Sequence, residues 1–423
     1  MNRLSPEDHP VHQWYRFVLS YPPHLVRTYL TRFGLTSQDC VLDPFCGTGT
    51  TLIECKKQGI PSVGVEANPM AHFASRTKAD WTPDPEGLRR HATVVAQATI
   101  HTLQLGGVDD QATFGATTAG AAALQTLPAD LSDLLLTDSI SPLPLHKVLT
   151  LLGSMREHCD ERFVAHEQLA LAKALVFGIS NLQFGPEVGV GPRKIDAQVV
   201  ATWLAGVHSI AEDLTQVQAL GSAESKVILG DSRQVVQTLQ PNSVSAVITS
   251  PPYPNEKDYT RTTRLESVLL GFIQSKEELR TLKRSLVRSN TRGVYKPDDD
   301  DQWVAEHVEI QRIAQAIEAR RLEFGKTSGF ERMYARVTKL YFGGMARHLA
   351  ELRSALRPGA HLAYVVGDQA SYLRVMIRTG QILADIASSL GYEVESIDLF
   401  RTRLATATRE QLREEVLVLR WPG

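Results

Sequence analysis

A short apolar segment followed by a glycine turn near the N-terminus constrains the fold of this 423-residue chain most strongly. Residues 40–45, CVLDPF, predict a buried strand, and the turn that follows contains Gly47 and Gly49. Residues 52–58 favour a helix, and residues 61–66, PSVGVE, predict the next strand. A strand, a helix and a second strand in this order form a unit with parallel strands, so helices must cover the faces of the sheet.

The later strand patterns are separated from this unit by a long helical stretch. This stretch is rich in Ala and Leu and contains a loop-like segment at residues 185–194. Strand patterns resume at residues 226–231, 244–253, 357–368, 392–400 and 415–421, and the last two read as a closing pair. We expect one α/β core in two parts, residues 1–80 and 226–423, divided by a mainly helical insertion at residues 81–225.

The glycine turn suits a nucleoside ligand that carries positive charge, although two glycines alone would fit a structural turn equally well. Glycines directly after a strand let the backbone approach a ligand more closely than a side chain would allow. Glu66 follows Gly49 by 17 residues, near the offset of about 20 at which a carboxylate accepts ribose hydroxyls. Asp43 leads the turn, and an acidic group there suits a cation better than a pyrophosphate. S-adenosylmethionine, with its sulfonium and amino group, matches this description.

A proline pair follows the apolar strand predicted around residues 244–249. In Ser250-Pro251-Pro252-Tyr253 two N–H donors are missing, so the carbonyl groups of the turn are left to face something other than the sheet. A plain strand-ending turn is one interpretation. In the functional interpretation, Ser250 and the Pro251 carbonyl accept hydrogen bonds from an exocyclic amine, and Tyr253 is a stacking platform for a planar base.

Together these motifs resemble those of the amino-methylating DNA methyltransferases, which use S-adenosylmethionine to methylate cytosine N4 or adenine N6. VLDPFCGTGTT is similar to the cofactor loop of the family, GVEANPM to its second motif, and residues 230–253 to its joined third and fourth motifs. Residues 357–368 resemble the fifth strand of the core, and residues 12–34 resemble the helix that closes over the methionine end of the cofactor. The resemblance implies a Rossmann-like, seven-stranded class I methyltransferase core that is mostly parallel, with an antiparallel last strand.

The resemblance also assigns roles to individual residues. It implies that the cofactor turn lines the methionine side, Glu66 the ribose, Ala67 and Asn68 the adenine, and Asp231 the adenine amine. The implied cofactor contacts are Asp43, Pro44, Phe45, Cys46, Gly47, Thr48, Gly49, Thr50, Glu66, Ala67, Asn68, Asp231 and Ser232, and the implied catalytic residues are Ser250, Pro251, Pro252 and Tyr253.

The residue at the head of the proline motif bears on the target base. Within the family, Ser at this position goes mainly with cytosine N4, and Asp or Asn mainly with adenine N6, so Ser250 favours a site-specific cytosine-N4 DNA methyltransferase. The cofactor motif precedes the catalytic motif here, the reverse of many cytosine-N4 enzymes. None of the four cysteines follows proline, as a carbon-5 methyltransferase would need.

Four alternatives remain open at this stage: an adenine-N6 enzyme, a tRNA guanine-N2 methyltransferase, a non-catalytic DNA-recognition subunit, and a nicotinamide dehydrogenase. The RNA enzymes normally carry Asp before Pro-Pro-Tyr and an N-terminal RNA-binding domain. A dehydrogenase would carry a third glycine in the turn, which this chain lacks. The insertion at residues 81–225 is a candidate target-recognition region.

Basic residues gather beside the catalytic motif, although the whole chain has a formal charge of only -2. Residues 257–296 contain ten Lys or Arg and four acids, and five of the cations recur every four residues from Arg280 to Lys296. If helical, these five form one stripe suited to phosphates; a solvated helix face is the alternative. We expect duplex DNA to be held by a basic helical segment at 257–350, with contacts from Lys257, Arg261, Arg264, Arg280, Lys283, Arg284, Arg288, Arg292, Lys296, Arg193 and Lys194.

Composition and the remaining motifs exclude several other classes. With 43% apolar and 22% charged residues, and no run of about 18 apolar residues, we expect a folded protein of the cytoplasm with no membrane partner. The resemblance implies a prokaryotic protein that is associated with the nucleoid. Cysteine and histidine spacings predict no metal site. Residues 298–301 read as a solvated acidic loop, and the apolar positions from Phe330 to Tyr341 read as core. A cognate restriction endonuclease is a candidate partner.

Overall fold

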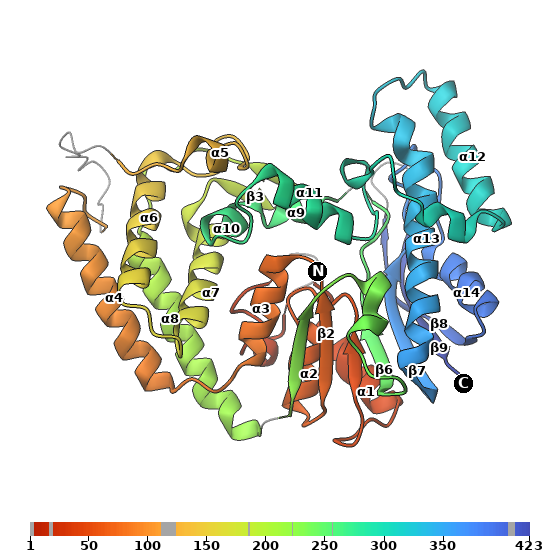
Figure 1. Cartoon of the computed structure of the whole chain (residues 1–423), viewed down its shortest axis with the longest axis horizontal. Coiled ribbons are helices and arrows are strands. Elements are labelled where there is room, and N and C mark those ends of the chain that lie inside the picture. The colour runs from red at the N-terminus through yellow and green to blue at the C-terminus, as the bar shows by residue number, and fades with distance from the viewer. Residues whose placement is uncertain are drawn as a thin grey trace. The chain divides into compact units, whose positions relative to one another are not determined.

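The chain folds into two compact units in the computed structural model, which describes residues 4–16, 20–110, 124–184, 187–221, 223–255, 257–404 and 411–423. We call them the core unit and the helical unit (Figure 1). Each is assembled from three segments of the chain. The core unit comprises Tyr21–His72, Ala223–Tyr259 and Arg280–Gly423, and the helical unit comprises Met1–Ser20, Phe73–Ser222 and Thr260–Leu279.

A seven-stranded sheet in the order β5-β2-β1-β6-β7-β9-β8 forms the centre of the core unit. β1, β2, β5, β6 and β7 are parallel, whereas β9 runs antiparallel to both β7 and β8. This mostly parallel sheet with an antiparallel end confirms the expected Rossmann-like fold. The strands span Val41–Asp43 (β1), Ser62–Glu66 (β2), Ser225–Leu229 (β5), Val244–Thr249 (β6), Leu356–Gly367 (β7), Glu393–Leu404 (β8) and Gln411–Arg420 (β9).

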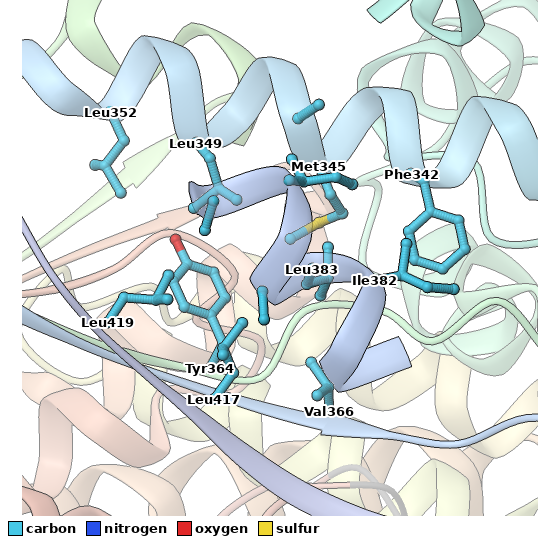
Figure 2. Packing of buried hydrophobic residues seen from close by; sticks show 14 of the residues in the cluster. Phe342, Met345, Leu349, Leu352, Tyr364, Val366, Ile382, Leu383, Leu417 and Leu419 are labelled. Atoms are coloured by element: carbon cyan, nitrogen blue, oxygen red, sulfur yellow. The ribbon is translucent and has the colours of Figure 1, made fainter. Parts of the chain in front are cut away.

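Helices cover both faces of this sheet because its central strands are apolar on both sides. Val365 and Val416 belong to a buried cluster with residues of α1 and α2, and their neighbours Tyr364 and Leu417 belong to a second cluster with residues of α12, α13 and α14. Figure 2 shows α13 and α14 packed over β7 and β9 in the second cluster. The helices lie at Pro23–Arg32 (α1), Thr50–Lys57 (α2), Lys276–Ser285 (α11), Val308–Glu323 (α12), Tyr334–Leu352 (α13) and Thr379–Ser389 (α14).

The parallel strands bring several loops to one edge of the sheet. β1, β2, β5, β6 and β7 all run in the same direction, so their carboxyl ends lie at the same edge, which is where α/β proteins bind ligands. The ends of β1, β2, β5 and β6 and the segments that follow them contain the four groups of residues that the sequence marks as functional. We call this edge the carboxyl edge.

The helical unit packs long helices against one another, chiefly α4 with α8 and α6, and α7 with α8. It also contains a hairpin of two short antiparallel strands, β3 and β4. The expectation of a loop at residues 185–194 is wrong at residues 188–190, which form β4, whereas residues 191–194 have no regular secondary structure. In the part of the chain that the structure describes, no helix is long and apolar enough to span a bilayer. The remaining elements are α3 (Pro69–Ala79), α4 (Pro85–Leu105), α5 (Ala129–Ser132), α6 (Pro142–Glu157), α7 (Val164–Ala174), β3 (Leu182–Phe184), β4 (Val188–Val190), α8 (Val199–Val217), α9 (Tyr259–Thr262) and α10 (Arg264–Leu269).

The helical unit includes more of the chain than the expected insertion at residues 81–225. The central segment of the helical unit is Phe73–Ser222 rather than residues 81–225, and the unit also includes Met1–Ser20 and Thr260–Leu279. Where the functional domain boundaries lie stays a prediction.

Candidate active site

The predicted cofactor turn lies between β1 and α2. Gly47 has a φ of 52° and Gly49, the N-cap of α2, a φ of 84°, both in the left-handed region that favours glycine. The Gly49 N–H donates to the Cys46 carbonyl at 2.7 Å, and the Cys46 N–H donates to the Val65 carbonyl at 3.1 Å. These bonds fasten the turn to β2 and bring the amino terminus of α2 to the carboxyl edge.

Asp43 ends β1 and is fully buried. Its carboxylate accepts hydrogen bonds from Thr249 Oγ1 at 2.6 Å, from the Phe45 N–H at 3.1 Å and from the Tyr21 hydroxyl at 3.0 Å. Burial raises the pKa of Asp43, although these donors act in the opposite direction. The carboxylate therefore joins the turn to the end of β6 and to the segment before α1, and its contact with a cationic ligand stays a prediction.

Glu66 ends β2 and is partly exposed. Its Oε2 accepts from the Gly47 N–H at 2.8 Å, and its Oε1 accepts from the Asn68 N–H at 2.8 Å. Each oxygen keeps a further lone pair, so the carboxylate can also accept two ribose hydroxyls. Burial raises the pKa of Glu66 to about 7, although the N–H groups of Asn68 and Gly47 lower it. Asn68 has a structural task as well, because its Oδ1 accepts from the Met70 N–H at 3.0 Å in the first turn of α3.

Asp231 and Ser232 follow β5, and the Asp231 carboxylate is held there by Arg233. The guanidinium donates from Nη2 to Oδ2 at 2.7 Å and from Nε to Oδ1 at 3.0 Å, and the Arg233 N–H donates to Oδ1 at 2.9 Å. A forked pair of this kind fixes the orientation of the carboxylate. The carboxylate thus has a fixed place at the carboxyl edge, and its contact with an adenine amine stays a prediction.

His348 on α13 supports the same loop, although no sequence motif includes it. A carbonyl can only accept, so Nδ1 donates to the Ser232 carbonyl at 2.9 Å and Nε2 accepts from the Tyr364 hydroxyl at 2.7 Å. Burial lowers the pKa of His348 to about 4, which keeps the imidazole neutral near neutral pH. Its ring also meets the Phe45 ring edge-on, with the centroids 5.0 Å apart. The buried His348 therefore contacts both the loop after β5 and the turn after β1.

The proline motif follows β6 and lies along the end of β7. The Ser250 hydroxyl donates to the Val365 carbonyl at 3.1 Å and also lies beside the Tyr253 hydroxyl, and a serine oxygen has two lone pairs, so it can still accept from an amine. The Tyr253 ring is partly exposed and lies against Gly367, since a Cβ built on Gly367 would be 3.1 Å from Tyr253 Cε2. β6 and β7 are neighbours and β6 also pairs with β1, so the structure brings this motif and the cofactor turn to adjoining strand ends.

Comparison with known proteins supports the family that the motifs resemble. The model of the N6/N4 DNA methylase family matches residues 5–75, which include the cofactor turn and Glu66. Type II methyltransferase M.BsoBI of Geobacillus stearothermophilus is 25% identical over 95% of this chain and 82% of its own length. Type II methyltransferase M.AvaI of Nostoc sp. is 24% identical over 98% of this chain and 87% of its own length. These matches support a DNA amino-methyltransferase.

S-adenosylmethionine is the methyl donor of this methyltransferase. The lone pairs of Glu66 and the left-handed glycine turn fit a ribonucleoside at the carboxyl edge. When bound, the cofactor supplies an electrophilic methyl carbon. Among solved structures, TrmN from Thermus thermophilus matches over 94% of this chain and 48% of that chain at 11% identity, but the TM-score of 0.28 is too low to bear on fold or function.

The basic stripe predicted for this methyltransferase is wrong beyond α11. The helix ends at Ser285, so only Arg280 and Arg284 lie four residues apart on its exposed face. Arg288 is 4% exposed, and its guanidinium pairs with Asp298 at 2.8 Å and 2.7 Å. Arg288 is therefore an internal partner of a carboxylate, which removes it from the surface that DNA could reach.

Some of the other predicted DNA contacts are exposed cations, and others form ion pairs within the protein. Arg292 and Lys296 are exposed outside α11, whereas Lys283 pairs with Asp258 at 3.1 Å. Arg261 and Arg264 belong to the helical unit, and Lys257 belongs to the core unit. The segment 257–296 is thus divided between the two units.

Two cations of the helical unit have partners within that unit. Arg193 forms an ion pair with Asp138 while remaining largely exposed. The Lys194 ammonium donates to the Gly178 carbonyl at 2.7 Å. Their predicted contact with DNA stays a prediction.

The acidic segment 298–301 does not form a solvated loop. Asp298 pairs with Arg288, and Asp300, which is buried, pairs with Arg233. The expectation that the apolar positions from Phe330 onward are core is likewise wrong at its start, because Phe330 is exposed at the surface whereas Tyr341 is fully buried.

The raised pKa of Glu66 predicts that cofactor affinity depends on pH. Below the pKa of about 7 the carboxyl gains a proton and loses acceptor capacity for the ribose hydroxyls. The dissociation constant of S-adenosylmethionine should therefore rise as the pH falls from about 8 to about 6 and level off above that range. Calorimetric titration at several pH values measures this, with Glu66→Gln as the control. The variant should bind more weakly with little pH dependence, and an equal pH dependence in Glu66→Gln would contradict the assignment.

Proposed function

We propose that this protein methylates the N4 amine of cytosine at specific sites in double-stranded DNA, as the methyltransferase of a restriction-modification system. The observation that carries the proposal is the state of Ser250. The Ser250 hydroxyl donates a hydrogen bond to the Val365 carbonyl at 3.1 Å. The uncharged hydroxyl oxygen, at the end of β6, can then accept a hydrogen bond from an amine. Within the family that it resembles, Ser at this position goes mainly with cytosine N4.

The proposed chemistry is mainly the positioning of two bound reactants. The exocyclic nitrogen is a poor nucleophile because its lone pair is delocalised into the ring. Hydrogen bonds from its two N–H groups to Ser250 and to the Pro251 carbonyl would pull it towards tetrahedral geometry and aim the lone pair at the methyl carbon. Holding the reactants in line can account for a large part of the rate enhancement. No covalent bond to the protein is needed.

The proposed position of the base is on the Tyr253 ring, outside the duplex. An amine inside a base pair is not accessible to a methyl donor, so the nucleotide must be flipped out of the stack. Stacking of a base on an aromatic side chain contributes about 1–3 kcal/mol, which replaces part of the stacking energy lost from the duplex. The partly exposed ring at the carboxyl edge supports this role.

Duplex DNA would approach the core unit through its exposed cations. Arg280, Arg284, Arg292 and Lys296 are exposed near the catalytic motif in sequence, and their charge suits phosphates. The curated relatives are named Type II methyltransferases, which supports a role in restriction-modification with a cognate endonuclease as partner.

Methyl acceptance by substituted DNA tests the proposal. A long unmethylated DNA is amplified with N4-methyl-dCTP in place of dCTP, and separately with N6-methyl-dATP in place of dATP. With labelled S-adenosylmethionine, we expect the first product to accept little label and the second to accept as much as unsubstituted DNA. Loss of label only in the second product would indicate adenine as the target. Label in tRNA but in no DNA would indicate an RNA methyltransferase, and bound cofactor without any transfer would indicate a non-catalytic subunit.

A further inference from the structure

Gly367, at the end of β7, leaves room for the catalytic tyrosine. A Cβ built on it would lie 3.1 Å from Tyr253 Cε2, 3.6 Å from Tyr253 Cδ2 and 3.4 Å from Glu414 Cγ. Its φ is not among the left-handed values of the described chain, so the backbone conformation does not require glycine. The missing side chain is what matters, because the Tyr253 ring occupies the space that a methyl group would fill.

Glu414 packs against the same glycine from the neighbouring strand. The two residues are paired in the β7–β9 register, and Glu414 is 9% exposed. Its carboxylate accepts from Arg401 Nε at 2.6 Å, and Arg401 is its partner in the β8–β9 register. Arg403 is a weaker second partner at 3.5 Å. A carboxylate this well buried is costly without a charged partner, and the contact with Arg401 fixes its position.

The catalytic motif therefore touches β7 at two points. Ser250 donates to the Val365 carbonyl, and the Tyr253 ring lies on Gly367, two residues further along the strand. Side chains two residues apart on a strand point to the same face. Burial, together with the negative charge of Glu414, raises the pKa of Tyr253, so the phenol stays neutral. The loop is thus held along the last part of β7 at both its acceptor and its aromatic residue.

We propose that Gly367, Glu414 and Arg401 form a seat that fixes the Tyr253 ring in the orientation needed for a base to stack on it. The proposal rests on the proposed function, in which Tyr253 is the platform for the target base. The three are positioning residues, since they act on the base through the tyrosine. The antiparallel end of the sheet, β7 with β9 and β8, then contributes to the base site, whereas the parallel strands carry the cofactor side.

A double-mutant cycle of Gly367→Ala and Tyr253→Ala tests the seat. Displacing a reactant by about 1 Å can cost roughly 100-fold in rate, and the added Cβ requires the ring to move by only a few tenths of an ångström, so Gly367→Ala should lower kcat by roughly 3- to 10-fold. The KM for S-adenosylmethionine and its binding stoichiometry should stay unchanged. In the Tyr253→Ala background, Gly367→Ala should have no further effect, because the ring that it would displace is gone. A purely structural glycine would instead lower activity in both backgrounds.

Matched variants distinguish a displaced Tyr253 ring from a general packing defect. Gly153→Ala in α6, where a built Cβ meets nothing within 4 Å, should leave kcat unchanged. Glu414→Gln keeps the size of the side chain, and we expect it to lower kcat more than Arg403→Met does. This variant tests the seat even if Gly367→Ala does not fold. A wild-type kcat in both Gly367→Ala and Glu414→Gln, with Tyr253→Ala impaired, would overturn the seat alone. A fully active Tyr253→Ala would overturn the role of the tyrosine in the proposed function as well.

Discussion

Ser250→Ala is expected to lower kcat by roughly 100-fold, the scale on which removal of one group positioned at a reaction centre acts. The change removes the acceptor that the hydroxyl offers to the amine, together with its hydrogen bond to the Val365 carbonyl. The dissociation constant of S-adenosylmethionine should change little, because the cofactor turn is held by β2 and by Asp43 rather than by this hydroxyl. Single-turnover transfer of labelled methyl to DNA, with calorimetric titration of the cofactor, measures both quantities.

Ser243→Ala is the matched control for this change. Ser243 lies just before the amino end of β6 and loses only a hydrogen bond to the Gln240 carbonyl, so its turnover should equal that of the wild type. Full turnover of Ser250→Ala would show that the amine is held elsewhere. A parallel loss of cofactor binding would show that the hydroxyl shapes the cofactor site instead.

Arg233→Ala is expected to have the largest effect on stability, about 3–5 kcal/mol in the free energy of unfolding. The side chain is almost buried and pairs with two carboxylates, those of Asp231 and Asp300. It also donates to the Arg284 carbonyl at 2.9 Å, at the end of α11. Removing it leaves the Asp231 carboxylate without its cation and the buried Asp300 carboxylate with only the longer contact to Arg347 at 3.4 Å. Urea unfolding followed by circular dichroism measures the change.

Arg312→Ala provides the comparison for this stability effect. Arg312 pairs with Glu309 on the exposed face of α12, and exposed pairs contribute about 0–1 kcal/mol. Cofactor affinity should also fall in Arg233→Ala, since the guanidinium fixes the loop that contains Asp231 and Ser232. Equal stability of the two variants would contradict the structural role given to Arg233.

The parallel half of the fold and the position of the motifs could be predicted from the sequence. Glycines after an apolar segment, followed by a helix and a second strand ending in Glu66, specify a local unit whose geometry hardly depends on the rest of the chain. Parallel strands then oblige the loops after β1, β5 and β6 to share an edge. Local rules of this kind are sufficient for Gly47, Glu66 and Ser250 to be found without a structure.

The residues that support the site could not be found in this way, because their partners are distant in sequence. His348 reaches Ser232 across 116 positions, and Thr249 reaches Asp43 across 206. A lone histidine on an apolar helix carries no local signal. Thr249 stands directly before Ser250, and that adjacency was the one available hint. Periodicity failed for Arg288 for a different reason: α11 ends at Ser285, so Arg288 lies outside the helix, where its guanidinium pairs with Asp298 in the interior.

The identity of the methylated nucleoside tests the central claim most directly. The purified protein is incubated with labelled S-adenosylmethionine and unmethylated duplex DNA, the DNA is digested to nucleosides, and the labelled product is identified by mass and chromatographic position. The account predicts N4-methyldeoxycytidine, absent when Ser250→Ala replaces the wild type. N6-methyldeoxyadenosine as the labelled product would contradict it.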